Sequence, residues 1–521
     1  MELSFLEKLL NYYGISLEEY EFLTRELTIS DLPNHLSFNR MDEAISIVKD
    51  AMKKSEKIIV YGDYDADGVM STSIVVKAFS LIKYDVNYYV PSRYLDGYGI
   101  NLAKAKEIVE KGYKLLITVD NGVTAFEAIE YCKNHGMRII VIDHHEYEKT
   151  LPEADVILHP QISNFGKIKT SAGFVSLMFA TALIGHFDKY LMTLASISLI
   201  TDMMPLKEYN RDLLRYVFSN YKFGEFKNLD LLSDGEKFDE STIGMKIGPK
   251  INAIGRLIKN TNINRLVNYF TTNDLSVINH LYAWIIEVNE QRKIKSKNAI
   301  DNLEDIDSKQ DGLVVLVDCE EGLIGIIANK ILNEYRKPVV VFTKDSANPE
   351  VLKGSCRSLE GFDIIKAFDG LSEFSITSGG HALAGGISIN NKDLEKFTIK
   401  FNEIARKHPP LSIISKNIQI KLVDVSLSNY RLLESLSPFG EDWRAPLFML
   451  KHIKCDALTF SRTGEHIMTS LSPSIKLVGF NISRASLKDI GFIDAVGKIE
   501  THSYNGNDYI QFKIEETTSA D

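Results

Sequence analysis

Three aspartates at alternate positions form a dense group of side chains that could do chemistry. Asp63, Asp65 and Asp67 lie in the segment YGDYDADG, between an apolar run that predicts a buried strand and a segment that predicts a helix. Carboxylates held this close repel one another, so a bound cation is the simplest physical reason for the cluster. The alternative is an acidic, solvated turn that ends at Gly68.

Polar side chains also follow the next two predicted strands. The run LLITV is followed by Asp120, and the run IIVI is followed by DHH, which contains His144 and His145. Farther along, Asp202 ends a strongly apolar segment, where an unpaired carboxylate would be costly. Ligands bind at the carboxyl ends of the strands in open α/β sheets, so we expect these groups to meet. Oxygen ligands with one imidazole suit Mg²⁺ or Mn²⁺, and two such ions about 4 Å apart are common in phosphoryl hydrolysis.

Two glycine-rich segments late in the chain carry groups that can bind phosphate. The first, GSCRS, contains Ser355 and Arg357, and the second, GGHALAGG, contains Gly379, Gly380 and His381. Glycine lets the backbone approach an oxyanion closely, and serine, arginine and histidine supply hydrogen-bond donors. A turn or packing role is the alternative for each segment taken alone.

Two loops in the first half of the chain add basic and amide side chains. PSRYLDGYG contains Arg93, and GPKINAIGR contains Asn252 and Arg256. Glycine and proline predict loops here, from which an arginine can reach a phosphate. The alternative is that both segments are ordinary surface loops. The occurrence of these segments in this order, together with the carboxylate motifs, disfavours that alternative.

These side chains need a scaffold of alternating strands and helices. From residue 57, β-branched runs alternate with helical segments, which predicts a mostly parallel sheet built from βαβ units. A polar helix leads to a second α/β pattern, and short alternating runs near the end predict a small β-barrel or sandwich. We therefore expect a helical lead-in over 1–50, an α/β domain over 51–285, a connecting helix over 286–310, a second α/β domain over 311–410 and a β-domain over 411–521.

The composition is that of a globular chain with several domains. Its 521 residues are 45% hydrophobic and 25% charged, which excludes a disordered or fibrous chain and predicts three or four domains at roughly 150 residues each. The net charge of −10 argues against coating of nucleic acid by bulk charge. Residues 1–50 hold ten acidic and four basic residues, so much of the excess negative charge lies outside the predicted site. The total leaves room for a basic channel made by Arg93, Arg256, Arg292 and Arg357.

Three features favour a cytoplasmic protein. The four cysteines are far apart and form no CxxC pair, which predicts neither a disulfide framework nor a thiolate zinc site. No basic segment followed by an apolar core, as in a signal peptide, begins the sequence. The uncharged run Thr170–Phe187 is borderline for a membrane span, but its Thr, Ser, Gly and His residues favour a buried helix.

The motifs together resemble those of the DHH superfamily of phosphoesterases. The similarity rests on DYDADG at 63–68, DNG at 120–122, DHH at 143–145 and the later aspartate at 202. It implies that His145 meets the scissile phosphate and that Asp63 is a further catalytic group. The metal ligands that it implies are Asp65, Asp67, Asp120, His144 and Asp202.

The glycine-rich segments resemble the DHH-associated domain, which pairs with the first domain across a cleft. The resemblance implies that this domain grips the nucleic-acid backbone or its terminal phosphate. The residues concerned are Ser355, Arg357, Gly379, Gly380 and His381.

Within the superfamily, the chain is similar to the RecJ family of exonucleases. The similarity implies that Arg93 reaches the 5′ phosphate and that Asn252 and Arg256 line the active site. The linking helix, with Asn289 and Arg292, also resembles that family.

The last domain resembles the OB-fold of RecJ, and such barrels bind single strands through basic grooves and stacking aromatics. Aromatic side chains available for stacking are Phe439, Trp443, Tyr504 and Tyr509. A place in the core of the barrel is the alternative for each of them.

The resemblance implies a metal-dependent, single-strand-specific exonuclease that acts on DNA from the 5′ end, in DNA repair and recombination. It implies hydrolysis of phosphodiester bonds to mononucleotides, two Mn²⁺ or Mg²⁺ ions, and a monomer beside a helicase or single-strand-binding protein. The sequence does not distinguish the two metals, or DNA from RNA. Two alternatives stay open: a DHH phosphoesterase acting on short oligonucleotides or cyclic dinucleotides, and a catalytically silent scaffold that binds nucleic acid. Small-substrate relatives resemble only the first two domains, so the last domain argues against the former.

Overall fold

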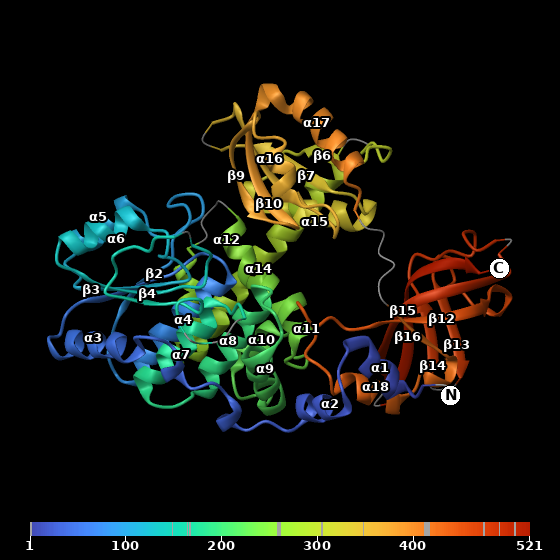
Figure 1. Ribbon diagram of the computed structural model, residues 1–521, viewed down its shortest axis with the longest axis horizontal. Coiled ribbons are helices and arrows are strands. Elements are labelled where there is room, and N and C mark those ends of the chain that lie inside the picture. The colour runs from blue at the N-terminus through green and yellow to red at the C-terminus, as the bar shows by residue number, and fades with distance from the viewer. Residues whose placement is uncertain are drawn as a thin grey trace. The chain divides into compact units, whose positions relative to one another are not determined.

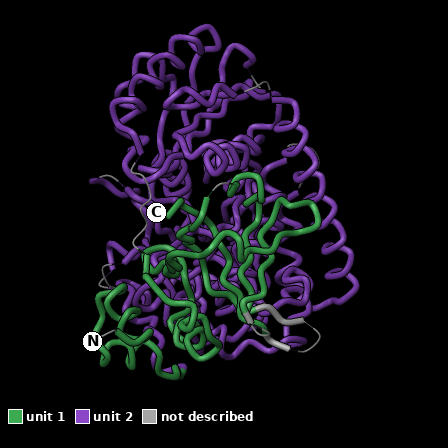
Figure 2. Tube along the Cα trace, turned by 90° about the vertical axis from the view of Figure 1, so that its right-hand side faces the viewer, with its two compact units in different colours: residues 1–28, 413–521 green, residues 29–412 purple. Residues whose placement is uncertain are grey.

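The chain forms two structural units, one of which contains both of its ends. In the computed structural model, unit 1 consists of Met1–Thr28 and Ile413–Asp521, and unit 2 of Ile29–Ser412 (Figure 1, Figure 2). The predicted lead-in, residues 1–50, is therefore divided between the two units. The structure describes residues 3–520, apart from residues 148, 164, 166, 167, 258–261, 304, 305, 347, 411–416, 473, 474, 489, 505 and 506.

Unit 2 begins with a five-stranded sheet in which all neighbouring strands are parallel. The order is β2-β1-β3-β4-β5, so the three strands that precede the predicted site residues are neighbours. Their apolar residues are buried along nearly their whole length, as expected for a parallel sheet covered on both faces. The predicted parallel α/β fold is confirmed. The strands are β1 (Ile58–Tyr61), β2 (Asn87–Tyr89), β3 (Leu115–Val119), β4 (Arg138–Ile142) and β5 (Val156–Leu158).

Helices cover both faces of this sheet (Figure 1). On one face, Ile108 and Ile129 from two helices join Leu116 and Ile139 of the strands in a hydrophobic cluster. On the other face, helix α4 is buried along almost all of its length and contacts α7 and α8. The helices are α3 (Met41–Lys53), α4 (Ala66–Leu81), α5 (Leu102–Glu110), α6 (Phe126–Asn134), α7 (Ala172–Ile184) and α8 (Lys189–Thr201).

Helix α7 occupies most of the long uncharged run and is buried, as predicted. The hydroxyl of Ser171 caps it by accepting a hydrogen bond from the Phe174 N–H, and it ends at Gly185, which has a φ of +89°. No described helix is long and apolar enough to cross a membrane.

A helical region follows and ends in the 27-residue helix α14 (Leu275–Asp301). This helix begins well before the expected start at residue 286, because Asp274 caps it and its early residues Ile278, Leu281 and Ile285 are buried. It is therefore part of the helical packing as well as a connection. The preceding helices are α9 (Glu208–Asn220), α10 (Lys227–Leu232), α11 (Glu240–Thr242), α12 (Gly248–Arg256) and α13 (Asn264–Thr271), with a π-helical turn at Ile243–Ile247.

The second α/β part of unit 2 is a mixed sheet with strand order β6-β7-β8-β10-β9. Only the first pair is parallel. Phe397 and Phe401 of helix α17 pack into its core together with Phe342 and Phe362. The elements are β6 (Leu313–Leu316), α15 (Ile324–Tyr335), β7 (Val339–Lys344), β8 (Val351–Arg357), α16 (Ile364–Asp369), β9 (Ser375–His381), β10 (Ala384–Asn390) and α17 (Leu394–Lys407).

Unit 1 is a six-stranded barrel-like sheet with helices from both ends of the chain. Its order is β11-β12-β15-β16-β14-β13. Phe5 of the first helix lies 5.6 Å from Phe448, between ring centroids, and Leu9 is fully buried in the same core. The elements are α1 (Phe5–Tyr13), α2 (Leu17–Thr24), β11 (Asn417–Ile420), α18 (Leu427–Glu434), β12 (Leu447–Lys454), β13 (Ile467–Ser472), β14 (Ile475–Gly479), β15 (Phe492–Tyr504) and β16 (Asn507–Ala520).

The aromatic side chains predicted for stacking have different surroundings in unit 1. Trp443 stacks on Tyr13 with ring centroids 4.4 Å apart and donates from Nε1 to the Leu436 carbonyl, and Phe439 also packs against the core. The ring of Tyr509 lies 5.2 Å from Lys476 Nζ. The side chain of Tyr504 lies outside the described part of the structure.

Candidate metal centre and phosphate-binding residues

The ends of three neighbouring strands bring the predicted carboxylates and histidines together. Asp63 and Asp65 follow β1, Asp120 follows β3 and His144 follows β4. Three overlapping groups have potential ligand atoms within 4.8 Å of one another. These groups are Asp63, Asp65 and Asp120; Asp120, His144 and His145; and Asp67, His144 and Asp202.

The turn after β1 is tight enough to require glycine. A Cβ on Gly68 would lie 2.4 Å from the carbonyl oxygen of Asp63, a contact that no other residue could tolerate. The carboxylate of Asp65 caps helix α4 by accepting a 3.1 Å hydrogen bond from the Gly68 N–H. The turn therefore holds both aspartates at the start of a buried helix.

His144 lies among carboxylates from three different elements. Its Nε2 is 3.2 Å from Asp120 Oδ1, 3.5 Å from Asp67 Oδ2 and 3.5 Å from Asp202 Oδ2. Burial lowers the pKa of His144, which favours the neutral imidazole that binds metals.

The carboxylates of the cluster oppose one another's ionisation. Burial, followed by repulsion from neighbouring aspartates, raises the pKa of Asp63 to about 8 and that of Asp202 to about 9. The same causes raise the pKa of Asp65 and Asp120. Asp63 Oδ1 and Asp202 Oδ2 are buried and accept no hydrogen bond from the described residues. Such oxygens fit a divalent cation, which would satisfy them and offset the repulsion.

Asp67 is held by groups that the sequence did not reveal. Its two oxygens accept 2.9 Å hydrogen bonds from the N–H groups of Ala172 and Gly173 at the start of helix α7. Ser198 of helix α8 donates a further 2.6 Å bond from its hydroxyl to Asp67 Oδ1. These hydrogen bonds fix the direction of the Asp67 carboxylate.

Asp120 has an unusual backbone conformation. Its φ of +60° is in the left-handed region, which aspartate tolerates better than most residues, and its N–H donates to the Ile142 carbonyl. Strained residues of this kind occur at functional sites. The conformation turns the chain at the end of β3, where Asp120 meets His144.

Asp143, the first residue of DHH, orients both histidines. Its Oδ1 accepts hydrogen bonds from the His144 N–H at 2.7 Å and the His145 N–H at 3.1 Å, and lies 2.8 Å from His145 Nδ1. Burial opposes the charge on Asp143, but the bond with His145 and its positive charge lower the pKa to about 2. Burial likewise opposes the charge on His145, but Asp143 raises its pKa to about 9.

Tyr98 also contacts the predicted catalytic histidine. Its hydroxyl lies 3.0 Å from His145 Nε2, and its ring packs edge-on to Tyr64. The guanidinium of Arg93 lies 4.4 Å above the ring of Tyr64. The loop that carries Arg93 therefore also supplies an aromatic contact to the site.

Four arginines gather beside the carboxylates. Burial, followed by the charges of Arg93, Arg292 and Arg357, lowers the pKa of Arg256 to about 10, while Asp65 acts in the opposite direction. Arg357 donates to the Ser355 hydroxyl at 3.0 Å. The Nε of Arg292 is buried and has no hydrogen-bond partner among the described residues. Guanidinium groups brought together in this way are suited to an anion such as phosphate.

Asn252 and the glycine-rich hairpin lie at the margins of this arrangement. The side-chain oxygen of Asn252 accepts a 3.0 Å hydrogen bond from the Ala66 N–H, so Asn252 holds the start of α4. Gly379, Gly380 and His381 are exposed on the β9–β10 hairpin. The pKa of Glu146, which follows His145, is lowered mainly by its ion pair with Lys169. The charge of His381 lowers it further.

Two of the site residues whose roles only the structure shows lie within motifs that the sequence identifies. Asp143 is the first residue of DHH, and Tyr98 lies in the Arg93 segment. Ser198 lies in no such motif, and it is 131 residues from Asp67 in the sequence.

Three family models match the chain in succession. Residues 57–204 match the DHH family, N-terminal domain, residues 310–407 match the DHHA1 domain, and residues 417–516 match the RecJ OB domain.

Curated relatives cover nearly the whole chain. The single-stranded-DNA-specific exonuclease RecJ of Haemophilus influenzae is 28% identical over 94% of this chain and 93% of its own length. The protein of the same name from Bacillus subtilis is 29% identical over 94% of this chain and 64% of its own length.

Solved structures share the fold. The crystal structure of RecJ in complex with Mn²⁺ from Thermus thermophilus matches with a TM-score of 0.85 and 22% identity, over 99% of this chain and 76% of that one. A crystal structure of exonuclease RecJ bound to manganese matches with a TM-score of 0.62 and 26% identity, over 74% of this chain and 97% of that one.

The parallel sheet, the Asp and His cluster at its edge and the family matches agree on one class of protein. Residues 57–204, which carry this cluster, match the N-terminal domain of the DHH family. Matches to the DHHA1 domain and the RecJ OB domain follow along the chain, and a curated RecJ protein matches nearly its whole length, so the predicted resemblance to RecJ is confirmed.

Proposed function

We propose that this protein is a metal-dependent exonuclease that degrades single-stranded DNA from the 5′ end to mononucleotides, in DNA repair and recombination. The observation that carries the proposal is the position of the arginine cluster beside the Asp and His cluster, within one structural unit. The carboxylates suit cations and the arginines suit a phosphate, as hydrolysis at a phosphorylated strand end requires.

The residues present fit one or two divalent cations. The ligands would be Asp65, Asp67, Asp120, His144 and Asp202, with Asp63 beside them. Because Asp120 belongs to two of the three groups, its two carboxylate oxygens could serve two neighbouring cations, whereas the neutral imidazole of His144 could bind one. Mn²⁺ or Mg²⁺ held there would supply Lewis acidity, which lowers the pKa of water and offsets charge on the phosphate. The Mn²⁺-bound relative of 26% identity supports this assignment.

The chain's own groups then act on the substrate. Asp143 keeps His145 protonated at neutral pH, so His145 can donate a hydrogen bond to the scissile phosphate. Arg93, Arg256 and Arg357 bind and orient the terminal phosphate, and the hairpin with Gly379, Gly380 and His381 follows the backbone. Asn252 acts through the loop before α4, which carries Asp65.

Unit 1 would bind single-stranded DNA. The exposed Phe480 lies edge-on to His466, and the guanidinium of Arg484 lies 5.2 Å from the ring of Phe460. Aromatic and basic groups at the surface of an OB domain are suited to stacking with bases and to phosphate contact. With Trp443 stacked on Tyr13, we assign base contact to Phe480 rather than to Trp443.

Digestion of end-labelled strands tests the proposal. With Mn²⁺, a 5′-labelled single-stranded DNA should release labelled mononucleotide at once, while a 3′-labelled strand should shorten progressively. RNA, duplex DNA and a dinucleotide serve as parallel substrates, and a dinucleotide cleaved faster than the long strand would favour the small-substrate alternative. Binding of single strands without cleavage under either metal would instead favour the silent scaffold.

A further inference from the structure

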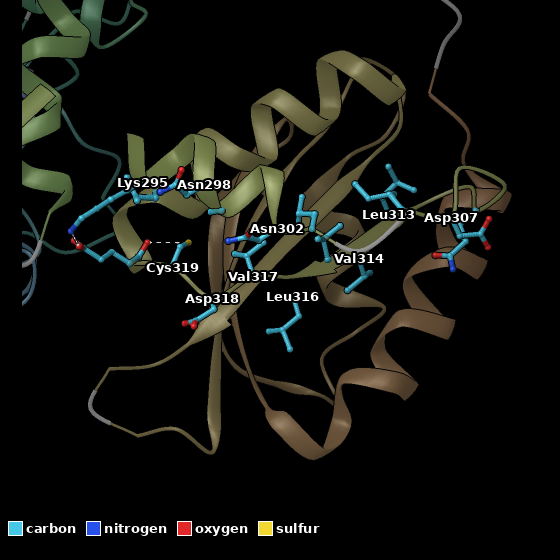
Figure 3. Close-up of a pocket in the computed structure, with 17 residues that line it drawn as sticks. Lys295, Asn298, Asn302, Asp307, Leu313, Val314, Leu316, Val317, Asp318 and Cys319 are labelled. Atoms are coloured by element: carbon cyan, nitrogen blue, oxygen red, sulfur yellow. Dashed lines mark hydrogen bonds and ion pairs between the residues drawn. The ribbon is translucent and has the colours of Figure 1, made fainter. Parts of the chain in front are cut away.

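A groove of about 750 Å³ lies in the second α/β part of unit 2 and contains none of the proposed catalytic residues. Its volume is within the range of about 300–1,000 Å³ typical of ligand sites. One wall is the end of α14, including Asn298, together with Asn302 directly after the helix, and the floor is the whole of strand β6 and the four residues after it. Figure 3 shows the lining side chains following the strand from Cys319 to Leu313.

Strand β6 is at the edge of its sheet, and in the described structure it pairs only with β7. The N–H groups of Leu313 and Val317 donate to carbonyls on the β7 side. In a parallel ladder alternate residues face the partner strand, so the backbone groups of Val314 and Leu316 face the open edge. Leu316 is 44% exposed. An open strand edge of this kind can accept a further strand.

The negative charge of the groove determines which kind of peptide can bind there as an added strand. Asp307 and Asp318 lie toward opposite ends of it, and Glu320 pairs with the lining cation Lys295. The excess of carboxylates repels phosphate, which excludes the groove from a path for nucleic acid. It attracts lysine and arginine side chains.

We propose that this groove binds an extended, basic peptide segment of a partner protein, which adds to the edge of β6 as a further strand. The backbone of Val314 and Leu316 pairs with the peptide backbone. Asp307 and Asp318 contact basic side chains near opposite ends of the peptide, which can share one face because alternate side chains of a strand project to the same side. Leu316 packs against its apolar side chains.

Fluorescence anisotropy with synthetic peptides tests the proposal on the full chain in Mg²⁺. The probe is a labelled octapeptide of alternating lysine and valine. It should bind at least about tenfold more tightly than a glutamate–valine octapeptide, because of the acidic lining. A lysine–valine peptide with N-methyl groups on alternate residues keeps its charge but loses backbone pairing, and should bind at least about fivefold more weakly.

Variants locate the binding site. Asp318→Lys and, independently, Asp307→Lys should each weaken binding at least about fivefold, while Asp369→Lys, an exposed carboxylate on α16, should not. All three should keep full nuclease activity. Equal binding of the N-methylated peptide, or displacement of the probe by single-stranded DNA, would overturn the proposal. A dimer in sedimentation that Asp318→Lys dissociates would also overturn it, because the occupant would be a second copy of the chain.

Discussion

The hydroxyl of Tyr94 donates a 2.7 Å hydrogen bond to the carbonyl oxygen of Arg256. The same hydroxyl accepts a 3.1 Å bond from the Gly322 N–H, and Arg256 Nη1 donates to the Gly322 carbonyl at 3.2 Å. A Cβ on Gly322 would lie 2.3 Å from the Arg256 carbonyl oxygen, so the backbones are in close contact. One tyrosine therefore ties the Arg93 loop, helix α12 and the second sheet region together at the proposed phosphate site.

Replacing this hydroxyl should loosen the arginine cluster. For Tyr94→Phe we expect a loss of about 1 kcal/mol in stability and a several-fold higher KM for 5′-phosphorylated strands, with little change in kcat. Tyr190→Phe is the matched control, since it removes a 2.7 Å bond to the Phe270 carbonyl among the helices. Steady-state kinetics and thermal melts of both variants check this. Equal KM values in the two variants would show that Tyr94 does not position the arginines.

Ser198 should matter for metal affinity. Ser198→Ala removes the 2.6 Å bond to Asp67, and loss of a hydrogen bond that orients a metal ligand typically costs about 10–100-fold in metal affinity or activity. Activity should therefore require more Mn²⁺ and recover when Mn²⁺ is raised. Ser196→Ala is the control, because its hydroxyl bonds to its own helix at Met192. A normal Mn²⁺ requirement in Ser198→Ala would contradict the role.

Metal stabilisation should increase with pH. The pKa of Asp63 is raised to about 8 and that of Asp202 to about 9, from an ordinary 3.8. Between the ordinary and the raised pKa values, the two carboxyl groups hold protons in the folded, metal-free protein that they have lost in the unfolded chain. The stability of the metal-free protein therefore falls as pH rises through this range. Binding of Mg²⁺ requires those protons to leave, so the Mg²⁺-induced rise in melting temperature should be larger at about pH 9 than at about pH 6. A rise that is independent of pH would speak against metal binding by these carboxylates.

Removing a proposed ligand should abolish hydrolysis while leaving DNA binding. Asp67→Ala and Asp120→Ala should each lower kcat by at least about a hundredfold, because the change removes a ligand rather than a supporting contact. Affinity for single-stranded DNA, measured by anisotropy without metal, should stay within a few-fold. Asp85→Ala changes an exposed carboxylate elsewhere and is the control. Retained cleavage in both variants would exclude these ligands.

The arginines should decide the preference for a phosphorylated end. Arg93→Ala and Arg357→Ala should each reduce the ratio of kcat/KM for 5′-phosphate over 5′-hydroxyl strands by about tenfold, since each removes a charged hydrogen-bond donor. Arg406→Ala, a 72% exposed arginine paired with Asp311, is the control. An unchanged ratio in both site variants would show that neither arginine recognises the terminal phosphate.

Much of the metal centre could be predicted because it follows from strand order. The β1, β3 and β4 strands are neighbours, so residues directly after them, such as Asp63, Asp120 and His144, must lie close together. Contacts made by helix packing could not be predicted in this way. Ser198 reaches Asp67 only because α8 packs beside α4, and no local pattern specifies which helices become neighbours.

The N-terminal segment shows the same limit. The alternation of Leu, Phe and acidic residues predicts an amphipathic helix, and α1 is one. An apolar stripe does not identify the surface that it covers, however, and Phe5 and Leu9 are buried in the core formed by the last hundred residues. The start of α14 was missed for a related reason: its first residues are apolar and continue the helical pattern before them.

Unit 1 is built from the first and last segments of the chain, with the whole of unit 2 between them. During synthesis the first helix therefore leaves the ribosome long before the strands that it packs against. Unit 2 can complete its folding while Phe5 and Leu9 are still exposed, and their core can form only after the strands from β11 to β16 have been synthesised. A circular permutant that links residue 521 to residue 1 and begins at residue 413 would make both units continuous, and its refolding would show whether this delay limits assembly.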